Sequence, residues 1–324
     1  MTSVRGRLAP SPTGRLHLGN AWAFLLAWLA CRKAGGTLVL RMEDIDPDRA
    51  TQDWAEEIVF DLHWLGLDWD EGPHPDGTPG ETGDCGPYVQ SRRGALYEQA
   101  LHRLGARVYP CYCTRKELRD QLHAMAGAPH VDDRGAPYPG TCRHLTAEER
   151  AQREAGGRHP CLRLNTEGLA DIVFMDALCG PQRFSLAGCG GDFALRRSDG
   201  VWAYQLAVVV DDALMGVNQV VRGEDILVST PRQLALFDLL GWPRPAYAHI
   251  PLLCDAAGER LAKRHNSLSL RALRAAGRTP QELVGLLAFK AGLQDRPDPK
   301  TPRELLDGFT WQRLPRGPVL LDAQ

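Results

Sequence analysis

Two short stretches, far apart in the chain, carry residue types suited to binding a nucleotide. The first is residues 10–20 (PSPTGRLHLGN), where a histidine and a glycine stand at the expected start of a helix. His17 can donate to a phosphate, and Gly19 lets a base approach the backbone because it has no Cβ. Backbone N–H groups at a helix start can also bind an anion. Alone, the letters HLGN are equally typical of a capping histidine and a packing glycine.

The second stretch is residues 259–265 (ERLAKRH), a basic loop after a glycine-bearing turn. Lys263 is suited to stabilising the negative charge that develops on an α-phosphate during adenylate formation. Alone, the stretch is equally typical of a solvated basic turn.

Three cysteines form a candidate metal site. Cys111 and Cys113 stand in a C-x-C pair, and Cys142 follows at a distance. Three thiolates hold Zn²⁺ if a fourth donor completes a tetrahedron, and His144 and His159 are candidates for that donor. The chain has nine cysteines, an odd number that does not indicate a disulfide framework. Three unrelated cysteines remain the alternative interpretation of the spacing.

The elements around the first stretch form a predicted βαβ unit. A short strand precedes Pro10, residues 18–34 read as a buried helix, and two glycines end it. Residues 37–42 then predict a strand that runs into the acidic cluster 43–46. The unit predicts an α/β fold with a parallel sheet that binds ligands at the carboxyl edge of its strands.

The rest of the chain divides at glycine- and proline-rich stretches. Residues 201–212 predict a buried β-rich or helix-to-strand segment, 217–221 a strand, and 280–291 a helix. The expected organisation is a first catalytic half, an insertion with its own small fold, a second catalytic half, and a loop with a helical C-terminal segment: residues 1–94, 95–199, 200–252 and 253–324.

Bulk properties narrow the class of protein. Of 324 residues, 44% are hydrophobic and 24% charged, which is typical of globular proteins. The net charge of −2 excludes a broad basic surface for nucleic acid but allows a local basic groove. The longest apolar stretch, 21–31, is far below the roughly 20 residues that span a bilayer, and no signal peptide is evident. We therefore expect a cytoplasmic protein with no membrane association.

Taken together, the motifs resemble those of class I glutamyl-tRNA synthetases. Residues 7–20 resemble the first signature of that class in its glutamate-specific form, and 260–264 (RLAKR) the second. Between them, in the order of that family, stand RMEDID (41–46), QSRR (90–93), GDF (191–193), DD (211–212), VRGEDIL (221–227) and STPRQ (229–233). The resemblance covers about residues 5–270 and implies a Rossmann-type catalytic domain.

Two departures from the family pattern stand out. Asn20 replaces the usual histidine of the first signature, and Arg260 and Ala262 replace the usual lysine and serine of the second. Lys263, the lysine expected to touch the phosphates, is retained. We therefore expect an active site with altered loop energetics.

The resemblance also implies ligand-binding positions, some of which suit their ligands chemically. Arg7 and Arg222 offer planar forks for the carboxylates of glutamate, and Glu43 offers a counter-charge for its ammonium group. Each alone is also compatible with a surface ion pair. The implied glutamate-binding residues are Arg7, Ala9, Ser11, Glu43, Tyr204 and Arg222. The implied ATP-binding residues are His17, Gly19, Asn20 and Lys263, of which His17 and Lys263 are also catalytic. ATP is expected with Mg²⁺, and one structural Zn²⁺ is implied on Cys111, Cys113, Tyr138 and Cys142.

The closer resemblance is to glutamyl-Q tRNA(Asp) synthetases, which lack an anticodon-binding half. Only 61 residues follow Lys263 (324 − 263), too few for that half. This family activates L-glutamate without tRNA and transfers it to the queuosine base of tRNA(Asp), and we expect a monomer that does the same. Two alternatives remain: a short glutamyl-tRNA synthetase that aminoacylates the 3′ end, and a non-catalytic nucleotide- or RNA-binding module.

Overall fold

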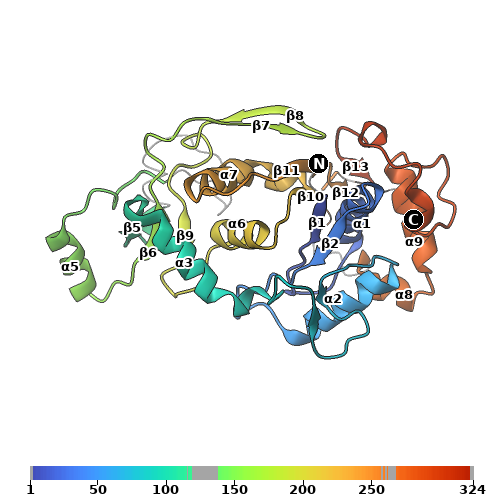
Figure 1. Ribbon diagram of the computed structural model, residues 1–324, viewed down its shortest axis with the longest axis horizontal. Helices are drawn as coiled ribbons and strands as arrows, with labels where there is room; N and C mark the ends of the chain where they lie inside the picture. The colour runs from blue at the N-terminus through green and yellow to red at the C-terminus, as the bar shows by residue number, and fades with distance from the viewer. Residues whose placement is uncertain are drawn as a thin grey trace.

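The computed structural model describes residues 3–114, 116–118, 138–256, 258–259, 261 and 268–321. Figure 1 shows three regions along the long axis of the molecule: a small lobe around β5, β6, β9 and α5, a central sheet with its helices, and a C-terminal region around α9.

The predicted βαβ unit is confirmed at the N-terminus. β1 (Arg5–Leu8) and β2 (Thr37–Leu40) pair in parallel, and α1 (Leu18–Lys33) connects them. α1 is apolar on most of its faces and buries two tryptophans, Trp22 and Trp28, so it is a core helix rather than a surface helix.

Among the residues that the structure describes, the central sheet has four strands and begins beside β1. β10 (Gln219–Gly223) lies beside β1, where the Arg5 N–H donates to Asn218 Oδ1 at 2.8 Å and the Asn218 N–H to Arg5 O at 3.0 Å. β11 (Ala246–Ile250) and β7 (Ile172–Asp176) follow in parallel.

β8 (Gly180–Phe184) closes this sheet by pairing with β7 in the antiparallel direction. The sheet is therefore mixed: the predicted parallel pairing holds for β10, β11 and β7 but not for β8. The physical reason is that a short turn after β7 joins the two strands as a hairpin, which permits only antiparallel pairing. Figure 1 shows this hairpin beside β11 and α7.

The second catalytic half contains a helix followed by a strand. α6 (Tyr204–Leu214) occupies most of the segment predicted to be β-rich or helix-to-strand, and the strand that follows begins at Gln219, so the second of these alternatives is the one observed. α6 is buried along most of its length, so its apolar residues run consecutively and give no helical period. It packs against α7 (Thr230–Leu239) and α3 (Gly94–Leu104).

A small antiparallel sheet lies in the lobe at one end of the molecule. Its strands are β5 (Val108–Cys111), β6 (Cys161–Leu164) and β9 (Ala194–Arg196), and α5 (Ala147–Ala155) lies beyond them. The expected insertion, 95–199, contains this sheet and also the β7–β8 hairpin, which pairs with β11 of the central sheet. The domain boundaries stay a prediction.

The C-terminal region is helical and joins the core of the N-terminal unit. α9 (Pro280–Lys290) confirms the predicted helix at 280–291, and the short α8 (Leu270–Ala275) precedes it. The remaining elements are α2 (Gln52–Trp64) and the short pairs β3 (Gly72–Pro73) with β4 (Glu81–Thr82) and β12 (Leu253–Cys254) with β13 (Val319–Leu320). In the part of the chain that the structure describes, no helix has the length and apolar character needed to cross a membrane.

Candidate active site

A cavity of about 400 Å³ lies where β1 and β10 end and α1 begins. Its lining includes all the predicted glutamate and nucleotide residues that the structure describes: Arg7, Ala9, Ser11, His17, Gly19, Asn20, Glu43, Tyr204 and Arg222. Lys263, Arg260 and Ala262 lie outside the described residues. Leu261 is described, is buried, and lines the cavity. The predicted ligand-binding residues, which are spread over more than two hundred positions of the sequence, therefore lie around one cavity at the carboxyl ends of β1 and β10.

His17 and Asn20 form the cap of α1. The Gly19 N–H donates to His17 Nδ1 at 3.1 Å, and the His17 N–H donates to Asn20 Oδ1 at 3.1 Å. The Gly19 N–H, expected to be available to an anion, is therefore bonded within the cap. Because Nδ1 accepts, the neutral His17 ring carries its proton on Nε2. A Cβ on Gly19 would lie 3.0 Å from the His17 ring, so this glycine also makes room for that ring.

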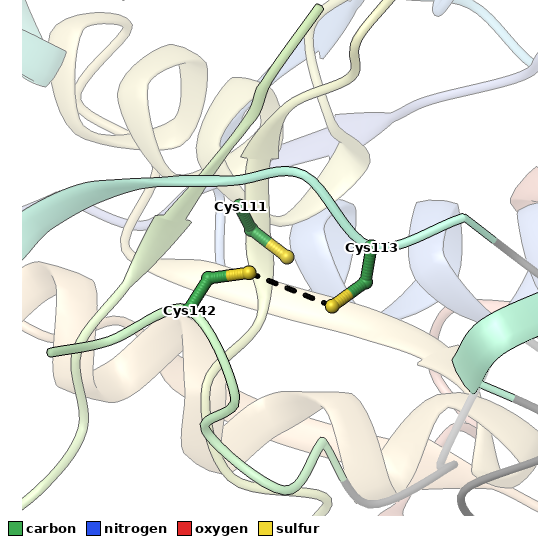
Figure 2. A group of neighbouring side chains, drawn as sticks. All are labelled: Cys111, Cys113 and Cys142. Carbon is green, nitrogen blue, oxygen red and sulfur yellow. Dashed lines mark hydrogen bonds between the residues drawn. The ribbon is translucent and has the colours of Figure 1, made fainter. Parts of the chain in front are cut away.

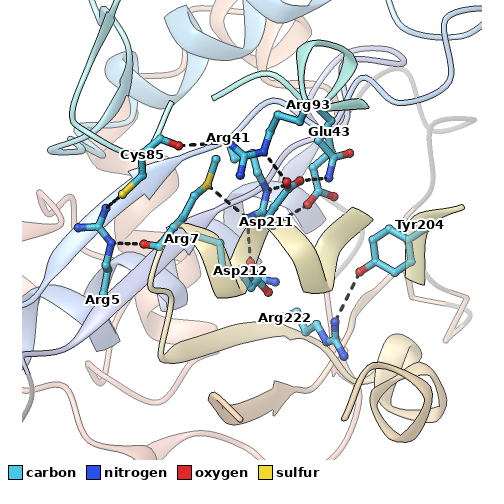
Figure 3. Close-up of polar contacts among 12 residues, drawn as sticks. Arg5, Arg7, Arg41, Glu43, Cys85, Arg93, Tyr204, Asp211, Asp212 and Arg222 are labelled. Carbon is cyan, nitrogen blue, oxygen red and sulfur yellow. Dashed lines mark hydrogen bonds and ion pairs between the residues drawn. The ribbon is translucent and has the colours of Figure 1, made fainter. Parts of the chain in front are cut away.

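A buried network of charges forms one wall of the site (Figure 3). Arg41, which is fully buried, donates to Glu43 at 3.0 Å and lies 2.8 Å from Asp212 Oδ1. Asp211 accepts from Arg93 at 2.5 Å and also from Gln90 and Tyr97. These contacts hold the carboxylate of Glu43, which lines the cavity, while Asp212 lies behind it in the network.

Arg7 and Glu43 meet this network from the cavity side. Arg7 is only 6% exposed, donates to the carbonyl of Val221 at 3.1 Å, and pairs with Asp212 at 3.7 Å. Burial raises the pKa of Glu43 above its ordinary value, although the arginines beside it act in the opposite direction. The surface ion pair considered for Arg7 is excluded, because both Arg7 and its partner are buried.

Arg222 is held by neutral side chains. It donates to Tyr204 at 3.5 Å (Figure 3), to Thr230 Oγ1 at 2.8 Å and to His249 Nε2 at 3.1 Å. His249 in turn contacts Asp176 at 2.6 Å. Thr230, His249 and Asp176 were not predicted as parts of the site, although Thr230 lies in the block 229–233. They come from three separate elements, and no spacing in the sequence links them.

The three cysteines lie together in the small lobe (Figure 2). The sulfur atoms of Cys111, Cys113 and Cys142 lie within 4.8 Å of one another, and the last two are 3.5 Å apart. Tyr138 contacts Cys111 Sγ at 3.3 Å and accepts from the Cys142 N–H at 2.9 Å. Zn–S bonds of about 2.3 Å give S···S edges of about 3.8 Å in a tetrahedron, so the donors are spaced as a metal requires.

The surroundings of the cysteines also suit a thiolate-bound cation. Hydrogen bonds from Cys113 and Cys142 lower the pKa of Cys111. The Arg163 guanidinium lies 4.2 Å from the centre of the Tyr138 ring. His144 and His159 are exposed, and neither belongs to the cysteine cluster in the described chain. Tyr138 is thus better placed than either histidine as the fourth donor.

The sequence of this chain matches a known protein family over most of its length. The model of tRNA synthetases class I (E and Q), catalytic domain, matches residues 3–298. The chain belongs to this family. It is a class I glutamyl-tRNA synthetase-like ligase, as the ordered motifs predict.

Within the family, the resemblance to glutamyl-Q tRNA(Asp) synthetases is confirmed. The chain is 59% identical to the glutamyl-Q tRNA(Asp) synthetase of Nitratidesulfovibrio vulgaris, over 99% of this chain and 96% of that protein. It is 53% identical to that of Symbiobacterium thermophilum, over 98% and 96%. It is 46% identical to glutamate–tRNA ligase 2 of Alkalilimnicola ehrlichii, over 89% of this chain but only 58% of that protein.

A solved class I structure shares the fold. The glutamate tRNA ligase of Elizabethkingia meningosepticum, solved in complex with its amino acid, superposes with a TM-score of 0.81 at 25% identity. The match covers 98% of this chain and 67% of that one. This class I synthetase chain therefore corresponds in fold to about two thirds of that ligase.

Proposed function

We propose that this chain uses ATP to convert L-glutamate to glutamyl adenylate without tRNA, and then transfers the glutamate to the queuosine base at the wobble position of tRNA(Asp). The observation that carries the activation step is the cavity, whose lining combines two buried arginines, the partly buried carboxylate of Glu43 and the capped start of α1. The names of the relatives that match nearly their full length support the choice of acceptor.

The amino-acid end of the cavity suits glutamate because it offers charges of both signs. Arg7 and Arg222 bind the two carboxylates, and Glu43 binds the ammonium group. Tyr204 and Ser11 add hydroxyl groups, while Ala9 contributes to the lining.

The nucleotide end lies at the start of α1. His17 donates from Nε2 to a phosphate oxygen, while Gly19 and Asn20 hold the ring and the cap in place. Lys263, two residues after the cavity-lining Leu261, stabilises charge on the α-phosphate. Mg²⁺ bound mainly by the ATP phosphates supplies further charge neutralisation.

Two displacements complete the reaction. An oxygen of the glutamate α-carboxylate attacks the α-phosphorus of ATP, and pyrophosphate leaves with the electrons of the broken P–O bond. A nucleophilic group of queuosine then attacks the activated carbonyl carbon, and AMP leaves. Positioning and charge stabilisation by the protein account for the rate, because no covalent enzyme intermediate is needed.

The small lobe is proposed to hold one structural Zn²⁺. Cys111, Cys113 and Cys142 provide thiolates, and the Tyr138 hydroxyl oxygen provides the fourth donor. Metal bound there stabilises a region whose own apolar core is small. We further expect the protein to act as a monomer in the cytoplasm.

Glutamate-dependent exchange of pyrophosphate into ATP, measured without any tRNA, tests the activation step. We expect exchange with L-glutamate and far less with L-glutamine or L-aspartate. Exchange that appears only on addition of tRNA would favour an aminoacylating enzyme, a candidate supported by the 46% identity to glutamate–tRNA ligase 2. Absence of exchange both with and without tRNA would favour the remaining alternative, a non-catalytic nucleotide- or RNA-binding module.

A further inference from the structure

Arg222 is held by hydrogen bonds to buried side chains that do not themselves line the cavity. Its Nε donates to His249 Nε2 at 3.1 Å, and its Nη2 donates to Thr230 Oγ1 at 2.8 Å. Thr230 Oγ1 lies 2.9 Å from His249 Nε2. Thr230 and His249 are at most 1% exposed, and neither is among the described residues that line the cavity.

The direction of each hydrogen bond in this chain is determined by arginine chemistry. A guanidinium only donates, so His249 Nε2 must accept from Arg222. The proton of the neutral imidazole therefore lies on Nδ1, where it donates to Asp176 Oδ2 at 2.6 Å. Thr230 Oγ1 accepts from Arg222 and lies 2.9 Å from His249 Nε2, so the single lone pair of that nitrogen faces both the Arg222 N–H and the threonine hydroxyl. Burial lowers the pKa of His249, which favours the neutral ring that this arrangement needs.

Asp176 fixes the histidine and is itself fixed by backbone groups. Its Oδ1 accepts from the N–H groups of Leu178 and Cys179, each at 2.9 Å, in the turn between β7 and β8. Asp176 is 2% exposed and stands opposite Tyr247 in the register of β7 with β11. The hairpin thereby holds a carboxylate at a defined place behind His249.

The same arrangement keeps a carboxylate away from Arg222. In the part of the chain that is described, the hydrogen-bond partners of Arg222 are Tyr204, Thr230 and His249, all neutral groups. The negative charge of Asp176 is separated from Arg222 by the imidazole ring. A buried guanidinium with neutral partners favours a carboxylate from a ligand, because a buried charge is stable only when it is paired.

We propose that Asp176 and His249 are positioning residues, which orient Arg222 and leave its charge available to a carboxylate of the amino-acid substrate. This inference rests on the proposed function for the identity of that substrate. It assigns a role in substrate binding to the β7–β8 hairpin, which carries none of the residues predicted to touch the ligands.

Asp176→Asn provides a test that preserves shape. The amide oxygen can still accept from Leu178 and Cys179, but the amide NH₂ then faces His249 Nδ1. His249 must move its proton to Nε2, where it opposes the N–H of Arg222. We expect the KM for glutamate in pyrophosphate exchange to rise about 10- to 100-fold, while the KM for ATP stays within about twofold. Asp171→Asn, in an exposed ion pair with Arg183 beside the same hairpin, is the matched control and is expected to change neither constant.

Nitrogen-15 NMR of the imidazoles gives a readout independent of catalysis, with the His249 signal assigned by its loss in His249→Gln. We expect the Nδ1–H form in the unaltered protein and the Nε2–H form in Asp176→Asn. A protein without any glutamate-dependent exchange would contradict the proposed function, while the NMR measurement would still test the hydrogen-bond chain. Normal exchange combined with an unchanged glutamate KM in Asp176→Asn would overturn the inference.

If Asp176→Asn does not fold, Thr230→Val answers the same question, because it removes the hydroxyl that Arg222 donates to without changing side-chain shape. A glutamate KM raised about tenfold at constant ATP KM supports the positioning role. An unchanged glutamate KM overturns it.

Discussion

At the scale of single residues, the site depends on where charges are buried and on which charges are compensated. Arg41 is fully buried among three carboxylates, those of Glu43, Asp211 and Asp212. Such a group is stable only while all its partners remain, since an unpaired buried charge is costly. The network therefore holds the Glu43 carboxylate at the edge of the cavity in one orientation.

The raised pKa of Glu43 predicts a pH dependence of glutamate binding. Burial raises this pKa, so Glu43 takes up a proton at a higher pH than an ordinary glutamate does. Protonation removes the charge that pairs with the ammonium group. Affinity for glutamate should therefore be retained above the raised pKa and fall as the pH drops through it, which calorimetry over a series of decreasing pH values can measure.

Glu43→Gln is the control for this pH dependence. The variant should bind glutamate at least about tenfold more weakly at high pH, because a charged hydrogen bond is lost. It should also lack the decline on acidification. The same decline in Glu43→Gln would show that another group is responsible.

The sequence could predict the residues that face the ligands but not the residues that hold them. Arg7, Glu43, Tyr204 and Arg222 stand in or beside recognisable motifs, and the structure places all four around one cavity. The residues that hold them were not predicted. His249 occupies a buried strand position where an apolar residue would fit the pattern equally well, and its partner Asp176 is 73 positions away.

At the scale of secondary structure, the start of α1 combines capping with binding. The His17 ring occupies the space above Gly19, where an added Cβ would be 3.0 Å and 3.1 Å from two ring atoms. The helix start is thus the element whose local shape most directly sets the position of a ligand-facing side chain.

Gly19→Ala should therefore displace His17 and raise the KM for ATP in pyrophosphate exchange by about tenfold or more, since a small displacement weakens a directed hydrogen bond. Gly35→Ala, at the other end of the same helix, is the matched control. Gly35 has φ of 64° and no neighbour within 4 Å of an added Cβ. The Gly35→Ala variant should have a free energy of unfolding lower by about 1 kcal/mol but unchanged kinetics of pyrophosphate exchange. Equal ATP constants in both variants would contradict the account of Gly19.

A helix or strand could be predicted where residues close together in the sequence determine its conformation. β1, α1 and β2 follow from their apolar runs and from the glycines that end the helix. The sequence left α6 undecided between helix and strand, because Val208, Val209 and Val210 favour a strand by their type, yet they lie in the buried part of a helix. Tertiary packing against α3 and α7 decides its conformation.

At the scale of the whole molecule, the described residues form two large apolar cores and one small one. The small core contains Tyr109, Cys111, Tyr112, Tyr138 and Cys142. So few apolar residues bury little surface, and small units of this kind commonly depend on a metal or disulfides. The proposed zinc site therefore has a structural role in the lobe, remote from the cavity lining.

Cys113→Ser should lower bound zinc and destabilise this lobe, which metal analysis and hydrogen exchange of the small sheet can measure. Cys161→Ser is the matched control, because Cys161 lies opposite Cys111 in the same sheet but outside the cysteine cluster. The control should retain its zinc. Stoichiometric zinc in Cys113→Ser, or none in the unaltered protein, would contradict the site.

The most direct test of the proposed function is the transfer of labelled glutamate to purified tRNA(Asp), with and without queuosine, using the unaltered protein and ATP. We expect label only on the queuosine-containing tRNA, and in a fragment that carries the anticodon loop. Label at the 3′ end, or equal labelling of both tRNAs, would contradict the proposed transfer to queuosine.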